Sequence, residues 1–281
     1  MSITKTIAGI TAGILIMAGI IYFSFTKTAR HIVARSEVKI EKTWELPSIL
    51  KEISGLSFID RNRVACIQDE DGILFIYNLD SSEIEKQIKF GGNADYEGVE
   101  IVNKIAYILL SDGNLIKIDD FENNPKIQNI STGLAKNEDF EGLAFDSKNN
   151  RLLLAQKEEN SKSPSIKAIY AFDLNVGKAQ KDPIYAINLE SPLFNKISGK
   201  KIHNKFRSSG IGVNPHTGEI FLVEGTRPKL LMLDKTGEAK RLLFLNEKNF
   251  PQPEGLAFNS DGDLYISTEG KPGMIHKVIV K

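Results

Sequence analysis

The chain has 281 residues, of which 41% are hydrophobic, enough to fill the core of one large domain or two small ones. Its 36 Lys and Arg residues equal its 36 Asp and Glu residues, so no net field attracts a polyanion, and nucleic acid is excluded as an expected partner. The single cysteine, Cys66, excludes an intrachain disulfide and a thiolate metal site. Any binding function must therefore come from a local site.

Residues 1–35 are predicted to form a membrane anchor with a juxtamembrane linker. The run from Ile7 to Phe25 has nineteen residues without a charge, about the length that crosses a bilayer core as a helix. A cleaved signal peptide is the alternative, but the run exceeds the usual ~7–15 apolar residues, and no small-x-small site precedes Lys27, Arg30 and Arg35. We therefore interpret it as a single retained transmembrane helix, a signal anchor, whose orientation the flanking charges leave open.

Residues 36–281 contain a repeated motif and are predicted to form the second domain. Each copy begins with Ser-Gly or Glu-Gly and continues with an apolar strand, a polar turn and a second apolar strand. A period of about 40–50 residues built from short strands indicates the blades of a β-propeller. The repeat glycines are separated by 43, 44, 68 and 45 residues and are Gly55, Gly98, Gly142, Gly210 and Gly255.

Two further strands follow the motif in most copies, such as Ile73–Tyr77 and Glu83–Phe90 in the first. The last copy ends with its third strand, Met274–Val280, while the strand-like stretch Lys39–Leu46 has no partner of its own. Pairing these two would close the ring and remove the exposed edges of a linear array. The sequence thus predicts an all-β fold, a five-bladed β-propeller with four-stranded blades that is closed by an N-terminal strand.

The 68-residue interval allows a six-bladed alternative. It contains two further strands, Ile169–Asp173 and Ile184–Leu189, followed by polar sequence without a Gly-led hairpin. The excess, roughly Ser191–Phe206, is lysine-rich and is interpreted as a surface excursion that could cover one mouth of the ring.

Acidic residues recur where each first strand starts and each second strand ends, and these two points lie on the same face of a blade. Glutamates are the better candidate ligands at the starts, because those positions begin the innermost strand. Arg227, Lys157 and Lys271 are expected to form ion pairs with the acids at the ends. The starts are Ser54, Glu97, Glu141, Ser209 and Glu254, and the ends are Asp69, Asp112, Glu158, Glu224 and Glu269.

These eight carboxylates predict a metal site around one mouth of the channel. Like charges around a narrow pore repel one another unless a cation or basic groups compensate them. An all-oxygen ligand set fits Ca²⁺ and, less well, Mg²⁺. The alternative is structural: the acids accept hydrogen bonds from the neighbouring blade, and the glycines allow close packing at the crowded centre.

The repeat as a whole resembles the SdiA-regulated (YjiK-like) family of bacterial propellers, over roughly residues 39–281. The resemblance implies a five-bladed propeller distantly related to NHL-repeat proteins, calcium at a shared site and exposure to the periplasm, and it brings no established activity. The long third interval departs from the family pattern. The resemblance rests on Glu-Gly-Leu-Ala-Phe at Glu141 and Glu254, Ser-Gly at Ser54 and Ser209, and the acids Glu224 and Glu269, behind one N-terminal span.

The sequence therefore favours a calcium-binding propeller tethered to the bacterial inner membrane by one span and facing the periplasm. We expect it to be monomeric and to bind a small molecule or an envelope protein. The alternative is a calcium-dependent hydrolase of esters, lactones or phosphoesters at the channel mouth. Such an enzyme needs a base, and of the four histidines only His203, in the excursion, could reach the mouth.

Overall fold

The computed structural model describes residues 37–134, 139–158, 163–197 and 201–281. The predicted transmembrane helix, Ile7–Phe25, lies outside these residues. Across the part of the chain that is described, no helix combines the length and the apolar character needed to span a membrane.

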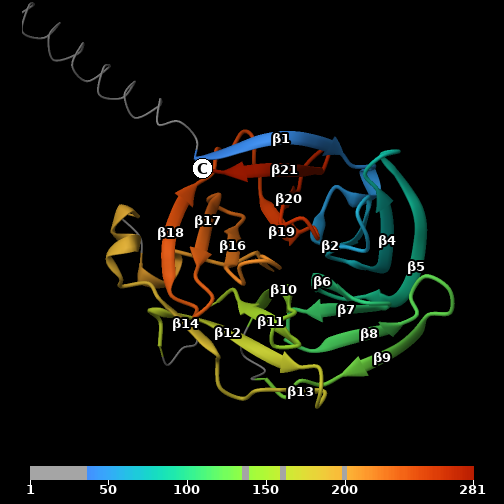
Figure 1. Cartoon of the computed structure of the whole chain (residues 1–281), viewed down its shortest axis with the longest axis horizontal. Helices are drawn as coiled ribbons and strands as arrows, with labels where there is room; N and C mark the ends of the chain where they lie inside the picture. Colours follow the sequence, from blue (N-terminus) through green and yellow to red (C-terminus); the bar gives the residue numbers. More distant parts are fainter. Residues whose placement is uncertain (1–36, 135–138, 159–162, 198–200) are drawn as a thin grey trace, which may run out of the picture. The chain divides into compact units, whose positions relative to one another are not determined.

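Five sheets surround a common axis, each with its first strand nearest the centre (Figure 1). All pairings within the sheets are antiparallel. The first two blades follow the prediction of four strands in chain order. Blade 1 comprises β2 (Ile53–Phe58), β3 (Arg63–Gln68), β4 (Asp71–Asn78) and β5 (Glu83–Asn93), and blade 2 comprises β6 (Tyr96–Val102), β7 (Ile105–Leu110), β8 (Leu115–Asp119) and β9 (Lys126–Ile130).

Blade 3 holds the long interval without forming a sixth blade. Its third strand pairs with two separate short strands at different points along its length, so the outer strand is split. Blade 3 comprises β10 (Phe140–Asp146), β11 (Arg151–Gln156), β12 (Ile166–Asp173), β13 (Lys178–Ala179) and β14 (Tyr185–Asn188), and blade 4 comprises β15 (Gly210–Val213), β16 (Ile220–Glu224), β17 (Lys229–Leu233) and β18 (Ala239–Phe244).

The ring closes as predicted, through the two ends of the domain. Blade 5 consists of β19 (Pro253–Phe258), β20 (Leu264–Thr268), β21 (Met274–Val280) and β1 (Val38–Glu45). β1 pairs with β21 from Val38 opposite Val280 to Glu45 opposite Met274. The five-bladed fold with four-stranded blades and N-terminal closure is therefore confirmed.

Polar turns join the first two strands of each blade, and their residue types explain them. In three blades an Asp or Asn follows the inner strand, and its Oδ1 accepts backbone N–H groups of the turn. Asp60 accepts from Asn62 and Arg63 at 3.0 and 2.9 Å, and Asn259 accepts from Asp261 and Asp263 at 3.1 and 2.8 Å. Such local bonds satisfy backbone donors that a strand ladder would otherwise hold, so the chain reverses there. Asn214 does the same in blade 4.

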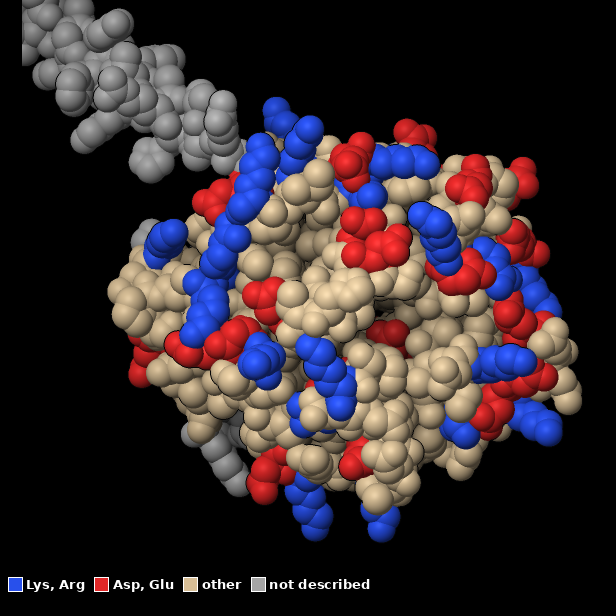
Figure 2. Space-filling view, in the orientation of Figure 1, with Lys and Arg blue, Asp and Glu red and all other residues tan. Residues whose placement is uncertain are grey.

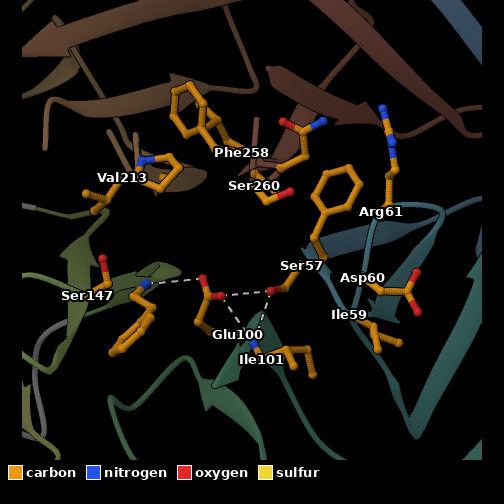
Figure 3. A pocket seen from close by; sticks show the side chains of 17 residues that line it. Ser57, Ile59, Asp60, Arg61, Glu100, Ile101, Ser147, Val213, Phe258 and Ser260 are labelled. Carbon is orange, nitrogen blue, oxygen red and sulfur yellow. Dashed lines mark hydrogen bonds between the residues drawn. The ribbon is translucent and has the colours of Figure 1, made fainter. Parts of the chain in front are cut away.

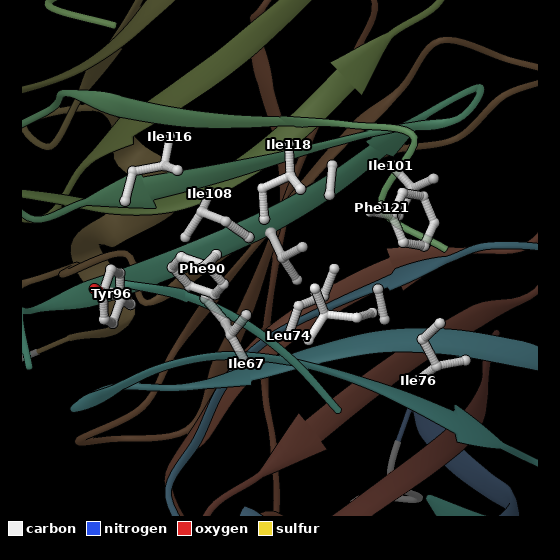
Figure 4. Close-up of a cluster of buried hydrophobic side chains, with 14 residues drawn as sticks. Ile67, Leu74, Ile76, Phe90, Tyr96, Ile101, Ile108, Ile116, Ile118 and Phe121 are labelled. Carbon is white, nitrogen blue, oxygen red and sulfur yellow. The ribbon is translucent and has the colours of Figure 1, made fainter. Parts of the chain in front are cut away.

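The hydrophobic core lies between blades rather than at the axis. Each of the five clusters found among the described residues joins two adjacent blades. In Figure 4, Ile67 and Leu74 of blade 1 face Ile108 and Ile116 of blade 2, next to the edge-on Phe90–Tyr96 pair, whose ring centroids are 5.1 Å apart. Blade-to-blade packing of this kind leaves the centre to the inner strands.

The excursion at 191–206 packs on the outer wall of the ring. Phe194 and Phe206 are fully buried in the cluster between blades 3 and 4. A short 3₁₀ turn, η2 (Pro192–Lys196), contacts β18, the outer strand of blade 4, at the periphery of Figure 1. A second turn, η3 (Ile202–Asn204), follows. The described part of the excursion is thus anchored by two aromatic side chains in the wall, and this part does not cover a mouth of the channel.

Candidate binding sites at the two ends of the channel

The repeat glycines form a tight collar where the inner strands of neighbouring blades touch. A Cβ at Gly55 would lie 3.0 Å from the backbone N of Val99, and one at Gly210 would lie 2.0 Å from the backbone O of Glu254. A Cβ at Gly210 would force the backbone to shift, and one at Gly55 would be tighter than ordinary contacts, so close packing explains these glycines, as the structural alternative proposed. The space inside the collar is about 10 Å³, roughly what one water molecule needs.

Apolar side chains narrow the channel just beyond the glycines and separate its two ends. Each inner strand contributes one aliphatic residue of the between-blade clusters to the lining of this narrow space, namely Leu56, Val99, Leu143, Ile211 and Leu256. On one side of this constriction lies the acidic entrance, which we define by the strand starts Ser54, Glu97, Glu141, Ser209 and Glu254. On the other side lies a larger cavity. In the orientation of Figure 1, the surface is hollowed at its centre, with acidic atoms in the depth (Figure 2).

Glu97 and Glu254 line the same small opening at the acidic entrance. Burial, followed by the charge of Asp95, raises the pKa of Glu97 to about 8. Burial, followed by the charges of Glu269 and Glu97, raises the pKa of Glu254 well above its ordinary value, and the Lys157 ammonium opposes both shifts. Two carboxylates that burial and mutual repulsion push toward protonation form a place where added positive charge would be favourable.

Glu141, the third glutamate at a strand start, already has a cationic partner. Glu141 is buried, with 4% of its surface exposed, and its Oε1 accepts a hydrogen bond from Nζ of Lys157. Lys157 also acts on the pKa values of Asp139 and Glu269. The expectation paired Lys157 with an acid at a strand end, whereas its closest partner starts β10. Its ammonium therefore supplies positive charge inside the entrance.

Two acids at strand ends are compensated by basic residues of blade 4 and its approach. Glu224 and Lys229 form an ion pair of 2.7 Å with side chains only 3% and 2% exposed. Glu158 pairs with Arg207, at about one-third exposure. The partner of Glu224 is thus Lys229 and not the expected Arg227, whose backbone carbonyl accepts a hydrogen bond from Lys229. Both acids are therefore already neutralised by an ion pair within the protein.

The remaining acids at strand ends lie in blades 1, 2 and 5. Burial and the neighbouring Glu52 raise the pKa of Asp69, and its Oδ1 is buried without a hydrogen-bond partner. Burial and the charge of Asp69 likewise raise the pKa of Glu269, which accepts a bond from Gln252. Asp112 is exposed, and its carboxylate accepts both the backbone and the side-chain N–H of Asn114 in its own turn. The acids nearest the opening are therefore Glu97 and Glu254.

Two serines supply hydrogen bonds that join neighbouring blades at this end. Ser54 Oγ donates to the backbone O of Tyr96 at 2.8 Å, and Ser209 Oγ donates to the backbone O of Pro253 at 2.7 Å. Both acceptors belong to the next blade. Among the described residues, no group of three or more His, Cys, Asp or Glu side chains is arranged to hold a metal ion. The side chains at the opening that could offer oxygen atoms to a metal ion are those of Glu97, Glu254 and Ser54.

The opposite end of the channel opens into a cavity of about 370 Å³, which we call the distal cavity. Every blade contributes to its wall, because the last residues of all five inner strands reach it (Figure 3). Phe58, Phe145, Val213 and Phe258 give the cavity its apolar surface, which is about matched by polar surface, and the polar turn residues Asp60, Arg61, Ser147 and Ser260 form the rim.

Glu100 reaches the distal cavity from β6 and is held by three neutral donors. Its Oε1 accepts from Ser57 Oγ at 2.8 Å and from the backbone N of Ile101 at 3.2 Å, and its Oε2 accepts from the backbone N of Phe145 at 3.1 Å (Figure 3). These donors come from blades 1, 2 and 3. Burial raises the pKa of Glu100 to about 7, and the three hydrogen bonds oppose that shift.

Glu100 is not among the site residues predicted from the sequence, although the repeat contains a signal for it. The residue two places after the repeat glycine is small in four copies, Ser57, Ala144, Gly212 and Ala257, and is Glu100 in the fifth. Small residues at this point leave the cavity open, and one large acid among them is the exception. The signal lies in the difference between copies, while the motif search looked for what the copies share.

The fold and these two ends define a class: a five-bladed β-propeller with a constricted axial channel. A family model described as SdiA-regulated matches residues 29–277. The chain belongs to the SdiA-regulated family, as its repeat suggested.

Two solved structures share the overall architecture. The glutaminyl cyclase of Myxococcus xanthus has a TM-score of 0.59 and 14% identity over 86% of this chain and 95% of its own. The PQQ-bound aldose sugar dehydrogenase of Streptomyces coelicolor has a TM-score of 0.52 and 12% identity over 86% of this chain and 98% of its own. Identities this low show a similar fold alone.

Proposed function

We propose that this protein is a binding module of the bacterial cell envelope whose acidic entrance takes a cation, with Ca²⁺ as the ion. The observation that carries the proposal is the pair Glu97 and Glu254, two carboxylates of raised pKa at one opening. A bound cation would favour their ionised forms and remove the repulsion between them. Asp69, on the same face, adds a buried carboxylate oxygen, Oδ1, that accepts no hydrogen bond.

Glu97 and Glu254 would supply the charge that holds the ion. The Ser54 hydroxyl, backbone carbonyls and water would supply further oxygens, because Ca²⁺ accepts six to eight of them in flexible geometry. Mg²⁺ demands a more regular shell and gives up water reluctantly, so it fits a ring of strand starts less well. The Lys157 ammonium competes for the same carboxylates and should limit the affinity.

Thermal unfolding of the full chain in detergent, after chelation and with or without added Ca²⁺, tests the proposal. A ligand that binds only the folded state raises the midpoint. Glu97→Gln and Glu254→Gln should each reduce the calcium-dependent rise, and Lys157→Gln should enlarge it. Glu83→Gln, on the exposed start of the outer strand β5, is the matched control and should leave the rise unchanged.

The outcome that would sink the proposal is a midpoint that ignores Ca²⁺ in the wild type and in Lys157→Gln. Loss of stability in Glu97→Gln without any calcium response would instead assign Glu97 a structural role. The opposite response of the lysine variant separates an electrostatic site from a general effect of mutation.

We also propose that residues 1–35 tether the propeller to the inner membrane, with the propeller in the periplasm. The uncharged stretch Ile7–Phe25 supports a span. The expected result is that the chain stays with membranes at alkaline pH and is digested by protease added to spheroplasts. Release at alkaline pH would contradict the span, and resistance to protease would contradict the orientation.

A hydrolase at the acidic entrance is the second candidate. A hydrogen bond between the Asp95 and Glu97 side chains contributes to the raised pKa of Glu97, and paired carboxyls that share a proton can act as acid and base. His276 is buried in β21 against Thr43 and His216 lies in an exposed turn. This hypothesis requires that the calcium-loaded chain hydrolyse a substrate from panels of esters, lactones or phosphoesters, and that Glu97→Gln abolish the activity. If no panel shows turnover, the hypothesis is wrong.

A further inference from the structure

The distal cavity combines a suitable volume, aromatic side chains in its wall, and a carboxylate, Glu100, that no basic side chain of the described residues pairs with. Its volume of about 370 Å³ falls within the range of small-molecule sites, which are lined mostly by apolar side chains with a few placed polar groups. It is distinct from the acidic entrance, because the collar and the aliphatic side chains next to it leave only about 10 Å³ between them. Occupants of the two ends would not touch.

The charged residues at the rim of the distal cavity, Asp60 and Arg61, have partners of opposite charge, whereas Glu100 at its floor has none among the described residues. Asp60 is bonded to Arg63 at 2.7 Å, and Arg61 lies 4.0 Å from Asp261. No ion pair joins Glu100 to a basic side chain within the residues that the structure describes. Only neutral donors hold this carboxylate, so a bound cation would meet an uncompensated negative charge in apolar surroundings, where such interactions are strong.

Glu100 also retains a position for a ligand. Its Oε1 accepts two hydrogen bonds and is saturated, whereas Oε2 accepts only the Phe145 N–H and can accept a second donor. Because three donors from three blades fix the carboxylate, little side-chain entropy would be lost when a ligand binds.

The walls favour an organic cation over a bare ion. Phe58, Phe145 and Phe258 line the same cavity as Glu100, and aromatic faces attract ammonium groups as well as apolar bodies. Figure 3 shows Phe258 on the side of the cavity opposite Glu100. A hydrated metal ion would leave this apolar surface without contacts. A benzyl-sized amine would place its ammonium at Oε2 and its ring among the phenylalanines.

We propose that the distal cavity binds a small organic cation, a primary amine with an apolar or aromatic body, with Glu100 as the charged anchor. Glu100 is the binding residue, Ser57 and the backbone of Phe145 position it, and the phenylalanines hold the body of the ligand.

Calorimetric titration of the full chain in detergent, with chelator present, tests the proposal with three probes of one shape. Benzylammonium carries a positive charge, benzyl alcohol none and benzoate a negative one. Benzylammonium should bind at least about tenfold more tightly than the other two, the factor expected for a hydrogen bond to a charged group. Equal affinity for the three probes, or no binding of benzylammonium at millimolar concentration, would overturn the proposal.

Two kinds of variant place the probe at Glu100. Glu100→Gln should weaken benzylammonium binding at least about tenfold and bring it close to benzyl alcohol. Because Glu100 also joins blades, exposed Ser147 at the rim provides a substitution that leaves its hydrogen bonds intact. Ser147→Lys should weaken and Ser147→Glu should strengthen benzylammonium binding at low salt. Unchanged affinity in Glu100→Gln and in both rim variants would refute Glu100 as the anchor.

Discussion

The two ends of the channel use carboxylates in opposite ways. At the acidic entrance two acids, Glu97 and Glu254, line a space of about 10 Å³, while the nearby Glu141 is paired with Lys157. At the distal cavity a single acid, Glu100, is held by three neutral donors below a space of about 370 Å³. The same residue type is thus electrostatically strained at one end and structurally bonded at the other.

The difference follows from position within the repeat. The residue before the repeat glycine lies at the beginning of the inner strand in every blade, and two of the acids there, Glu97 and Glu254, line the same opening. The residue two places after that glycine is acidic only in blade 2, so Glu100 faces small neighbours and has a cavity in front of it. A repeat therefore concentrates charge at positions where its copies agree and creates a site where one copy differs.

The largest effect should come from removing the cation of a compensated acid. Lys229→Met leaves Glu224 buried without its partner and should lower the free energy of unfolding by about 3–5 kcal/mol. Arg207→Met removes the partner of the far more exposed Glu158 and should cost less than about 1 kcal/mol. Urea unfolding at pH 7 measures both. Equal losses would contradict the view that burial decides the value of these pairs.

The constriction between the two ends can be tested at its glycines. Gly210→Ala places a Cβ against the backbone O of Glu254 and should lower the free energy of unfolding by at least about 1–3 kcal/mol, because backbone must move. Gly92→Ala, where no heavy atom lies within 4 Å, should change it by less than about 0.5 kcal/mol. If urea unfolding shows the two variants to be alike, the collar is looser than described.

Glu100→Gln, at the distal cavity, should destabilise the protein. In Glu100→Gln the amide oxygen can replace only one side of the carboxylate, facing either Phe145 N–H or Ser57 and Ile101, so the NH₂ on the other side loses the hydrogen bonds that the carboxylate accepted there, although Ile101 N–H keeps Ser57 Oγ as an acceptor. We expect the free energy of unfolding at pH 7 to fall by about 1–3 kcal/mol. An unchanged urea midpoint would show that Glu100 does not join the blades.

At the acidic entrance Glu97→Gln should instead stabilise the protein relative to wild type, and the size of this effect should depend on pH. The folded-state pKa of Glu97, about 8, lies above its unfolded value near 4.5. Its contribution is therefore full below pH 4.5 and is lost as the pH rises to 8. In the presence of chelator, Glu97→Gln should gain stability relative to wild type as the pH increases across this window. Urea midpoints at pH 5 and pH 8 check this, and parallel pH profiles for the two proteins would contradict it.

The sequence by itself determined the fold and the acidic face. Period, turn chemistry and an unpartnered first strand were enough for five blades and their closure, because these features are local and repeat in order. β21 (Met274–Val280) matches the predicted strand residue for residue. That strand starts and strand ends share one face also follows from strand direction alone.

Only the tertiary structure decided what each acid does. Glu141 and Glu254 occupy equivalent motif positions, yet Glu141 is paired with Lys157 whereas Glu254 lies at the opening beside other acids, and Glu224, at a strand end, is paired with Lys229. Those partners come from other strands or from distant parts of the same blade, and the repeat spacing says nothing about where their side chains point. The distal cavity is likewise a property of five strand ends meeting at one axis. No single copy of the repeat contains it, because its space exists only once the ring has closed.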